Sequence, residues 1–213
     1  VGGVVACNFK LNEKIASEIT KNLLEVILAT GFEKNSLNIL KRKKNLRIID
    51  ISEYKSKNIT SIKNFEGAFL VQNKDKIILD RKKLKCVTKL KPSKKELNEI
   101  EFTFNVSKYV KSNAIVLCNN FSTIGIGAGQ PSRFDSCKIA IQKAKKFQPQ
   151  KIKNSIAASD AFFPFTDGVE ALIKAGVKII IQPGGSIRDQ EVINCANKGK
   201  VKMLFTDIRH FNH

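Results

Sequence analysis

The chain has 213 residues, 42% of them hydrophobic, which is enough to build one large domain or two small ones around a sizeable core. It contains no uninterrupted apolar run of about 18 residues, so we expect no membrane span. With 38 Lys and Arg residues against 19 Asp and Glu residues, its net charge is +19 at pH 7.

This charge raises the question of a nucleic-acid partner, because a basic surface gains affinity by releasing phosphate counterions. Six of the basic residues are Arg, and the others are Lys residues spread along the chain, as is typical of solvated surface charge. A nucleic-acid-binding module is therefore kept as the alternative. The more general expectation is that the charge attracts small anionic substrates.

Five scattered Cys residues and two His residues, both among the last four positions, match neither a disulfide framework nor a zinc site. We expect reduced thiols in a cytoplasmic compartment. The first residue, Val1, is not Met and stands in a strand-like sequence. We therefore expect a fragment, a processed product or one piece of a split protein.

The first 80 residues mix helical and strand patterns. Residues 11–30 carry apolar side chains at helical spacing behind Asn12, a common N-cap type, and predict one long helix. Residues 46–51, 68–72 and 76–79 predict buried strands.

From Pro92 onward, strand and helix patterns alternate more clearly. Strands are predicted over 113–118, 123–128, 155–159, 177–182 and 201–205, and helices after Ser93, after Ser132, over 166–175 and from about 188 to 198. This alternation predicts an α/β fold, a layered mixed sheet with flanking helices, in two lobes spanning residues 1–92 and 93–213.

Three dense segments, 159–168, 182–189 and the terminal 209–213, follow predicted strands, where ligands of α/β folds collect. In residues 125–133, alternate Gly residues would let the backbone approach a ligand, and Arg133 suits bidentate recognition. Tight packing against the sheet explains the same glycines. Residues 182–189, rich in Pro and Gly, predict either another pocket wall or a structural turn.

The segment 162–165, Phe-Phe-Pro-Phe, carries three aromatic side chains that cannot all face a core from so short a loop. With Asp160 and Asp167 beside it, the segment predicts an apolar slot for a heteroaromatic ring that donates hydrogen bonds. A structural corner with Asp167 as a helix cap is the alternative. At the chain end, Arg209 suits a phosphate, while His210 and His213 are either proton-exchanging or structural imidazoles.

The motifs at 112–116, 123–133, 159–168, 182–189 and 209–213 occur in an order that resembles the C-terminal part of the bifunctional purine-biosynthesis protein family. That family joins an AICAR formyltransferase domain to an IMP cyclohydrolase domain. The resemblance implies a cytidine-deaminase-like fold and transfer of a formyl group from 10-formyltetrahydrofolate to AICAR (5-aminoimidazole-4-carboxamide ribonucleotide). It also implies a homodimer with its active site at the subunit interface.

The resemblance assigns Asn113 and Arg133 to the carboxamide end of AICAR, Phe162 to its imidazole and Arg209 to its 5′-phosphate. His213 is implied as a supporting residue for the site or its subunit contact. The folate-binding residues implied are Phe134, Pro164, Phe165, Asp167 and Ser186.

The chain departs from the family in one respect. In the family, the Lys–His pair of the formyl-transfer step and the cyclohydrolase domain both lie upstream of the position that corresponds to Val1, and neither is present here. A single general acid–base group contributes about 10²- to 10⁴-fold to a rate. We therefore expect this chain alone to turn over little and to need the upstream portion as a partner. An inactive remnant with a structural role is a further alternative. The resemblance implies no required metal, but it allows a monovalent cation near Asp160.

Overall fold

The computed structural model describes residues 2–55, 60–73, 75–210 and 212. It consists of two compact units, residues 1–74 and 75–213, and each is described by itself. This division differs from the boundary expected near Pro92. The segment before Pro92 belongs with the second unit because Leu79 is buried in the same apolar cluster as Ile100.

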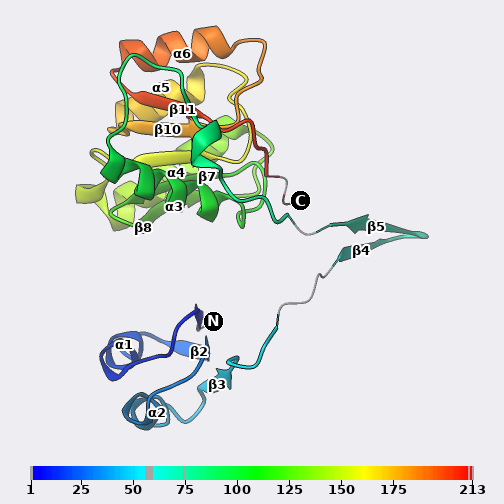
Figure 1. The fold of residues 1–213 in the computed structure, drawn as a ribbon, viewed down its shortest axis with the longest axis vertical. Coiled ribbons are helices and arrows are strands. Elements are labelled where there is room, and N and C mark those ends of the chain that lie inside the picture. The colour runs from blue at the N-terminus through cyan, green and yellow to red at the C-terminus, as the bar shows by residue number, and fades with distance from the viewer. Residues whose placement is uncertain (1, 56–59, 74, 211, 213) are drawn as a thin grey trace. The chain divides into compact units, whose positions relative to one another are not determined.

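The second unit is built on a six-stranded mixed sheet (Figure 1). Its strands are β6 (Lys85–Cys86), β7 (Ile115–Asn119), β8 (Ser122–Gly127), β9 (Ile156–Ser159), β10 (Ile179–Gln182) and β11 (Lys202–Phe205). They lie in the order β6-β11-β10-β9-β7-β8. Strands β9, β10 and β11 are parallel, while β6–β11, β7–β9 and β7–β8 pair antiparallel. The carboxyl ends of β8, β9, β10 and β11 therefore share one edge of the sheet.

Helices cover both faces of this sheet (Figure 1). They are α3 (Lys94–Ser107), α4 (Arg133–Phe147), α5 (Asp167–Ala175) and α6 (Asp189–Lys198), with the short 3₁₀ turns η1 (Arg81–Lys83) and η2 (Pro149–Lys151). Helix α3 begins at a capping box formed by Ser93 and Glu96. Helix α5 ends at Gly176, which has a left-handed φ of 101° that glycine adopts without strain.

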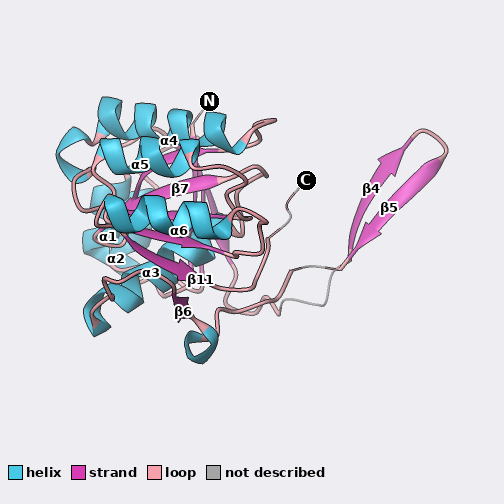
Figure 2. Cartoon of the chain, turned by 90° about the horizontal axis from the view of Figure 1, so that it is seen from above, coloured by secondary structure: helices cyan, strands magenta, loops and turns pink. Residues whose placement is uncertain are grey.

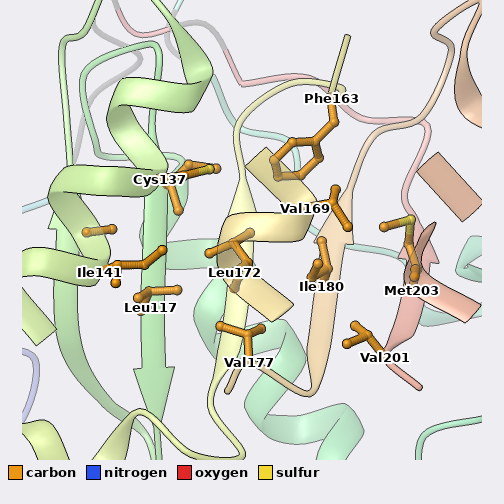
Figure 3. Close-up of a cluster of buried hydrophobic side chains, with 14 of the residues drawn as sticks. Leu117, Cys137, Ile141, Phe163, Val169, Leu172, Val177, Ile180, Val201 and Met203 are labelled. Atoms are coloured by element: carbon orange, nitrogen blue, oxygen red, sulfur yellow. The ribbon is translucent and has the colours of Figure 1, made fainter. Parts of the chain in front are cut away.

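The larger core lies between the sheet and helices α4 to α6 (Figure 3). Ile180 and Met203 point into it from β10 and β11, and Leu172 meets them from α5. On β10 the neighbours Ile179 and Ile181 face the other way, into the cluster under α3. This strand is buried on both sides, which explains its continuous apolar sequence.

The first unit contains a three-stranded parallel sheet of order β1-β2-β3. Its elements are β1 (Gly3–Cys7), α1 (Glu13–Ile19), β2 (Leu24–Ala29), α2 (Lys34–Leu40) and β3 (Arg47–Asp50). Ala16 of α1 and Leu40 of α2 pack into one cluster with Ile27 of β2, so both helices cover the same face. An antiparallel hairpin of β4 (Ser61–Phe65) and β5 (Ala68–Gln72) follows, with every residue of both strands exposed (Figure 2).

Several predictions for residues 1–80 need correction. The helix expected over 11–30 ends at Ile19, and its second half is strand β2; the N-cap at Asn12 is confirmed. The backbone of β2 pairs with the strands on both sides of it, and its β-branched Val and Ile residues suit a strand. This tertiary pairing outweighs the helical spacing of its apolar residues. Residues 76–79 form no strand, and the strand at 68–72 is exposed instead of buried. Helix α2 and strand β4 were not anticipated.

The α/β class, with mixed sheets and flanking helices, is confirmed. The strands and helices predicted between 93 and 213 are present within a few residues of their expected bounds. The cytidine-deaminase-like assignment stays a prediction. No helix in the described part of the chain has the length and apolar character needed to cross a membrane.

Candidate functional site

A cavity of about 660 Å³ opens at the edge of the second unit's sheet where β8, β9 and β11 end. Eight of the residues singled out from the sequence line it, from the loops after β8, β9 and β11 and the segment before β7. The lining residues are Asn113, Pro131, Ser132, Arg133, Phe134, Ala161, Phe162, Phe163, Pro164, Phe165, Asp167 and Arg209.

A buried ion pair between Arg133 and Asp160 supports the cavity wall. Their side chains are 8% and 1% exposed. Asp160 Oδ1 accepts hydrogen bonds from Arg133 Nη1 and from the Ala114 N–H, while Oδ2 accepts one from Ser112 Oγ. Arg133 Nη1 also donates to Ser159 Oγ at 2.8 Å. A buried charge pair is tolerated when it is hydrogen-bonded in this way, and the guanidinium is thereby held in place.

The same guanidinium orients Asn113. Arg133 Nη2 donates to Asn113 Oδ1 at 2.7 Å, and Asn113 Nδ2 donates to the carbonyl oxygens of Gln130 (2.9 Å) and Pro131 (3.2 Å). Ser136 Oγ donates to the Asn113 carbonyl. A planar amide and a planar guanidinium therefore stand side by side on the cavity wall.

The aromatic segment divides between core and cavity, as its sequence predicts. Phe163 is buried in the main core, and its N–H donates to Gln182 Oε1 at 3.1 Å. Phe162 and Phe165 stay partly or largely exposed. The guanidinium of Arg209 lies 4.9 Å from the ring centre of Phe162, and that of Arg188 lies 4.8 Å from Phe165, which are distances typical of cation–π contacts.

In the glycine-rich segment 125–133, two of the glycines are required for close packing, which was the alternative to a ligand-binding role. A Cβ on Gly125 would come within 2.1 Å of the Ala140 carbonyl oxygen, and one on Gly127 within 1.9 Å of the Ser136 oxygen. These glycines let helix α4 pack closely on β8. The cavity is lined instead by the end of this segment and the first residues of α4, Arg133 and Phe134.

Asp167 begins α5 at the cavity rim and accepts the Gly168 N–H at 2.6 Å; the N-cap position itself belongs to Thr166. Ser186 does not line the cavity. Its hydroxyl accepts the Arg188 N–H in the turn after β10, and its N–H donates to Asp189.

A buried thiol lies behind the site. Cys137 packs in the core, and burial raises its pKa to about 12 against a smaller opposing effect of Arg133. At neutral pH it is a protonated thiol and therefore a poor nucleophile.

His210 is a buried structural imidazole. Its backbone N–H donates to the Asp160 carbonyl at 2.9 Å, the centre of its ring lies 4.7 Å from that of Phe104, and its Nδ1 lies 2.6 Å from Asp75 Oδ2. Asp75 was missed by sequence reasoning, because it lies 135 positions from His210 and no local pattern marks it. Ser112 lies in the motif at 112–116 but was given no role of its own. His213, the predicted supporting residue, lies outside the described residues.

Among the described residues, no group of three or more His, Cys, Asp or Glu side chains could hold a metal ion. Asp160 already has a cationic partner in Arg133. A monovalent cation beside it would therefore need carbonyl and hydroxyl oxygens as its other ligands.

Comparison with known proteins identifies relatives of this chain. Residues 1–143 match the model of the family described as AICARFT/IMPCHase bienzyme. The bifunctional purine biosynthesis proteins PurH of Thermoanaerobacter sp. (strain X514) and Aquifex aeolicus (strain VF5) are 49% and 43% identical over 212 residues, 100% of this chain. A solved structure, reduced HcgD from Methanocaldococcus jannaschii, aligns with 98% of this chain and 73% of its own at 7% identity, but its TM-score of 0.23 is too low to indicate a shared fold.

The chain spans 41% of the length of these PurH relatives. Because the family match covers more than half of the chain and the relatives match it throughout, the chain belongs to the AICARFT/IMPCHase bienzyme family.

Proposed function

We propose that this chain is part of the AICAR formyltransferase portion of the bienzyme and that its cavity binds AICAR and a reduced folate. The reaction transfers the formyl group of 10-formyltetrahydrofolate to AICAR in IMP biosynthesis. The observation that supports this function best is the convergence on one cavity of an amide, two guanidinium groups and exposed aromatic rings.

The nucleotide half of the site is assigned to four residues. Asn113 and Arg133 recognise the carboxamide of AICAR, because a side-by-side amide and guanidinium match its planar donor and acceptor edge. Phe162 packs against the imidazole. Arg209, whose guanidinium is exposed above Phe162, binds the 5′-phosphate through charge-assisted hydrogen bonds.

The folate half is assigned to other residues that line the same cavity. Phe134, Pro164 and Phe165 supply apolar surface for the pterin, and Asp167 accepts its ring N–H groups. Ser186 acts from the neighbouring turn, which Arg188 connects to Phe165.

In the reaction, the 5-amino nitrogen of AICAR attacks the formyl carbon, the bond from that carbon to folate N10 breaks, and a proton passes from the amine to N10. The residues of this chain hold the two reactants in contact, which lowers the barrier by removing motional freedom before the reaction. The proton transfer is assigned to the family's Lys–His pair, which has no counterpart in this chain. The active form is proposed to be a cytoplasmic homodimer, with His213 and a monovalent cation near Asp160 supporting the site.

Calorimetry with AICAR and a folate analogue tests the assignment. Arg209→Ala should weaken AICAR binding by about 10- to 100-fold, since a hydrogen bond to a charged group contributes about 1.5–3 kcal/mol. Arg81→Ala is the control. It removes an Arg that pairs with Glu101 and does not line the cavity, so it should leave the affinity for AICAR unchanged.

Turnover should require the rest of the bienzyme, supplied for example from the Thermoanaerobacter relative. Tight RNA binding that is steeply salt-dependent and equally sensitive to Arg81 and Arg209 would favour the nucleic-acid alternative. Absence of AICAR binding even with the rest of the bienzyme present would leave only a structural remnant.

A further inference from the structure

The segment that carries Arg209 is hydrogen-bonded to the carboxylate of Asp75, the first residue of the second unit in sequence. Asp75 Oδ2 lies 2.6 Å from His210 Nδ1. Because an ionised carboxylate is an acceptor, the ring nitrogen carries the proton of this bond. Asp75 Oδ1 accepts the Ile77 N–H at 2.9 Å and lies 3.7 Å from Lys108 Nζ.

The charges around Asp75 keep it ionised. Partial burial opposes ionisation, but the hydrogen bonds from His210 and the Ile77 N–H, with the charges of His210 and Lys108, outweigh it and lower the pKa of Asp75. Lys108 is itself anchored, since its Nζ donates to the Ile77 carbonyl at 3.1 Å. The acceptor for His210 is therefore in place throughout the neutral range.

His210 in turn joins this anchor to the cavity. Its backbone N–H donates to the backbone carbonyl of Asp160, whose carboxylate pairs with Arg133, and its ring packs on Phe104 of α3. Its neighbour Arg209 is exposed and forms no ion pair with the described side chains; its guanidinium lies over Phe162. The position of a long exposed side chain is fixed only when its backbone is fixed. The backbone at Arg209 therefore needs contacts from neighbouring residues.

We infer that Asp75 is a positioning residue for phosphate binding: through the His210 ring it holds the backbone from which Arg209 reaches the cavity. The inference rests on the proposed function, because it assumes that Arg209 meets the phosphate of AICAR. Ordering one long side chain before binding is worth up to about tenfold in affinity.

The test compares AICAR with its riboside, which lacks the phosphate. Asp75→Ala should weaken AICAR binding about tenfold and riboside binding less than about twofold. Asp75→Asn keeps an oxygen acceptor for His210 and should retain most of the AICAR affinity. Asp207→Asn removes the same charge two residues from Arg209 but touches only the exposed pair with Lys85, and should leave both affinities unchanged. Equal losses for AICAR and riboside would overturn the inference, because they indicate a general structural effect.

A second readout needs no ligand. In the free protein, Asp75→Ala should shift the His210 ring signals and speed the exchange of the Arg209 Nε–H in NMR spectra; unchanged spectra would overturn the inference. If the wild-type chain binds no AICAR while the spectra change as expected, the proposed function fails, but the role of Asp75 in positioning the Arg209 backbone through His210 is upheld. Should Asp75→Ala lose its cooperative unfolding transition, His210→Asn applies the same test with a side chain too short to reach Asp75.

Discussion

The two units differ in how completely they bury their sheets. The six-stranded sheet of the second unit has α3 on one face and α4 to α6 on the other, and its cavity lies at the strand ends. The parallel sheet of the first unit has α1 and α2 on a single face. A fully covered sheet provides a rigid support for a site, and every lining residue of the cavity comes from the second unit.

The other face of the first unit's sheet is apolar and open. Register places Val4 beside Val26, and Leu28 between Ala6 and Ile49, on the side away from the helices. Val4 is 67% exposed. Parallel sheets in proteins are normally covered on both faces. Among the described residues of the first unit, no helix or strand covers this face, so we expect the unit to be marginally stable when isolated.

The largest expected effect separates the units. Residues 75–213 expressed alone should show dispersed NMR signals and a cooperative thermal transition, whereas residues 1–74 should show neither. The smaller unit has a one-sided sheet and an isolated two-stranded hairpin, which is marginally stable at best in water. A cooperative transition in residues 1–74 would remove the contrast.

The next effect concerns buried charge. Asp160→Ala leaves the guanidinium of Arg133 buried without its partner and should lower the free energy of unfolding by about 3–5 kcal/mol in urea denaturation. In the first unit, Glu18→Ala breaks an ion pair with Lys21 that is largely exposed and should cause no measurable loss. A loss below about 1 kcal/mol for Asp160→Ala would contradict the buried network.

A third pair of substitutions compares backbone packing. Gly127→Ala forces a Cβ against the α4 backbone and should cost about 3 kcal/mol in unfolding free energy. Gly67→Ala meets no atom within 4 Å, so only the strain of its φ of 75° applies, about 1 kcal/mol. Equal costs would mean that α4 can move away from β8.

The smallest effect tests the open sheet face. Val4→Thr should change the unfolding free energy by less than about 0.5 kcal/mol, because an exposed methyl group loses little packing. The same substitution should reduce binding of the apolar dye ANS, because it makes this exposed face less apolar. A cost well above 1 kcal/mol would show that this face is covered in solution.

Sequence reasoning succeeded where the signal was local. In the second unit, strand and helix periods follow from side chains two or three to four positions apart, and the loops at the strand ends were recognised from their Gly, Pro and aromatic residues. Eight candidate residues converged on one cavity for this reason. Reasoning failed at β2, where apolar residues at helical spacing form a strand because β1 and β3 lie on either side of it.

The sequence by itself determined the α/β class, the loops of the candidate site and the family. Only the tertiary structure decided that Gly125 and Gly127 serve packing, that Asp160 is neutralised by Arg133, and that His210 is held by Asp75. The physical reason is distance along the chain. A helix or strand period is repeated within ten residues, whereas a hydrogen bond between residues 135 positions apart leaves no pattern until the backbone has folded.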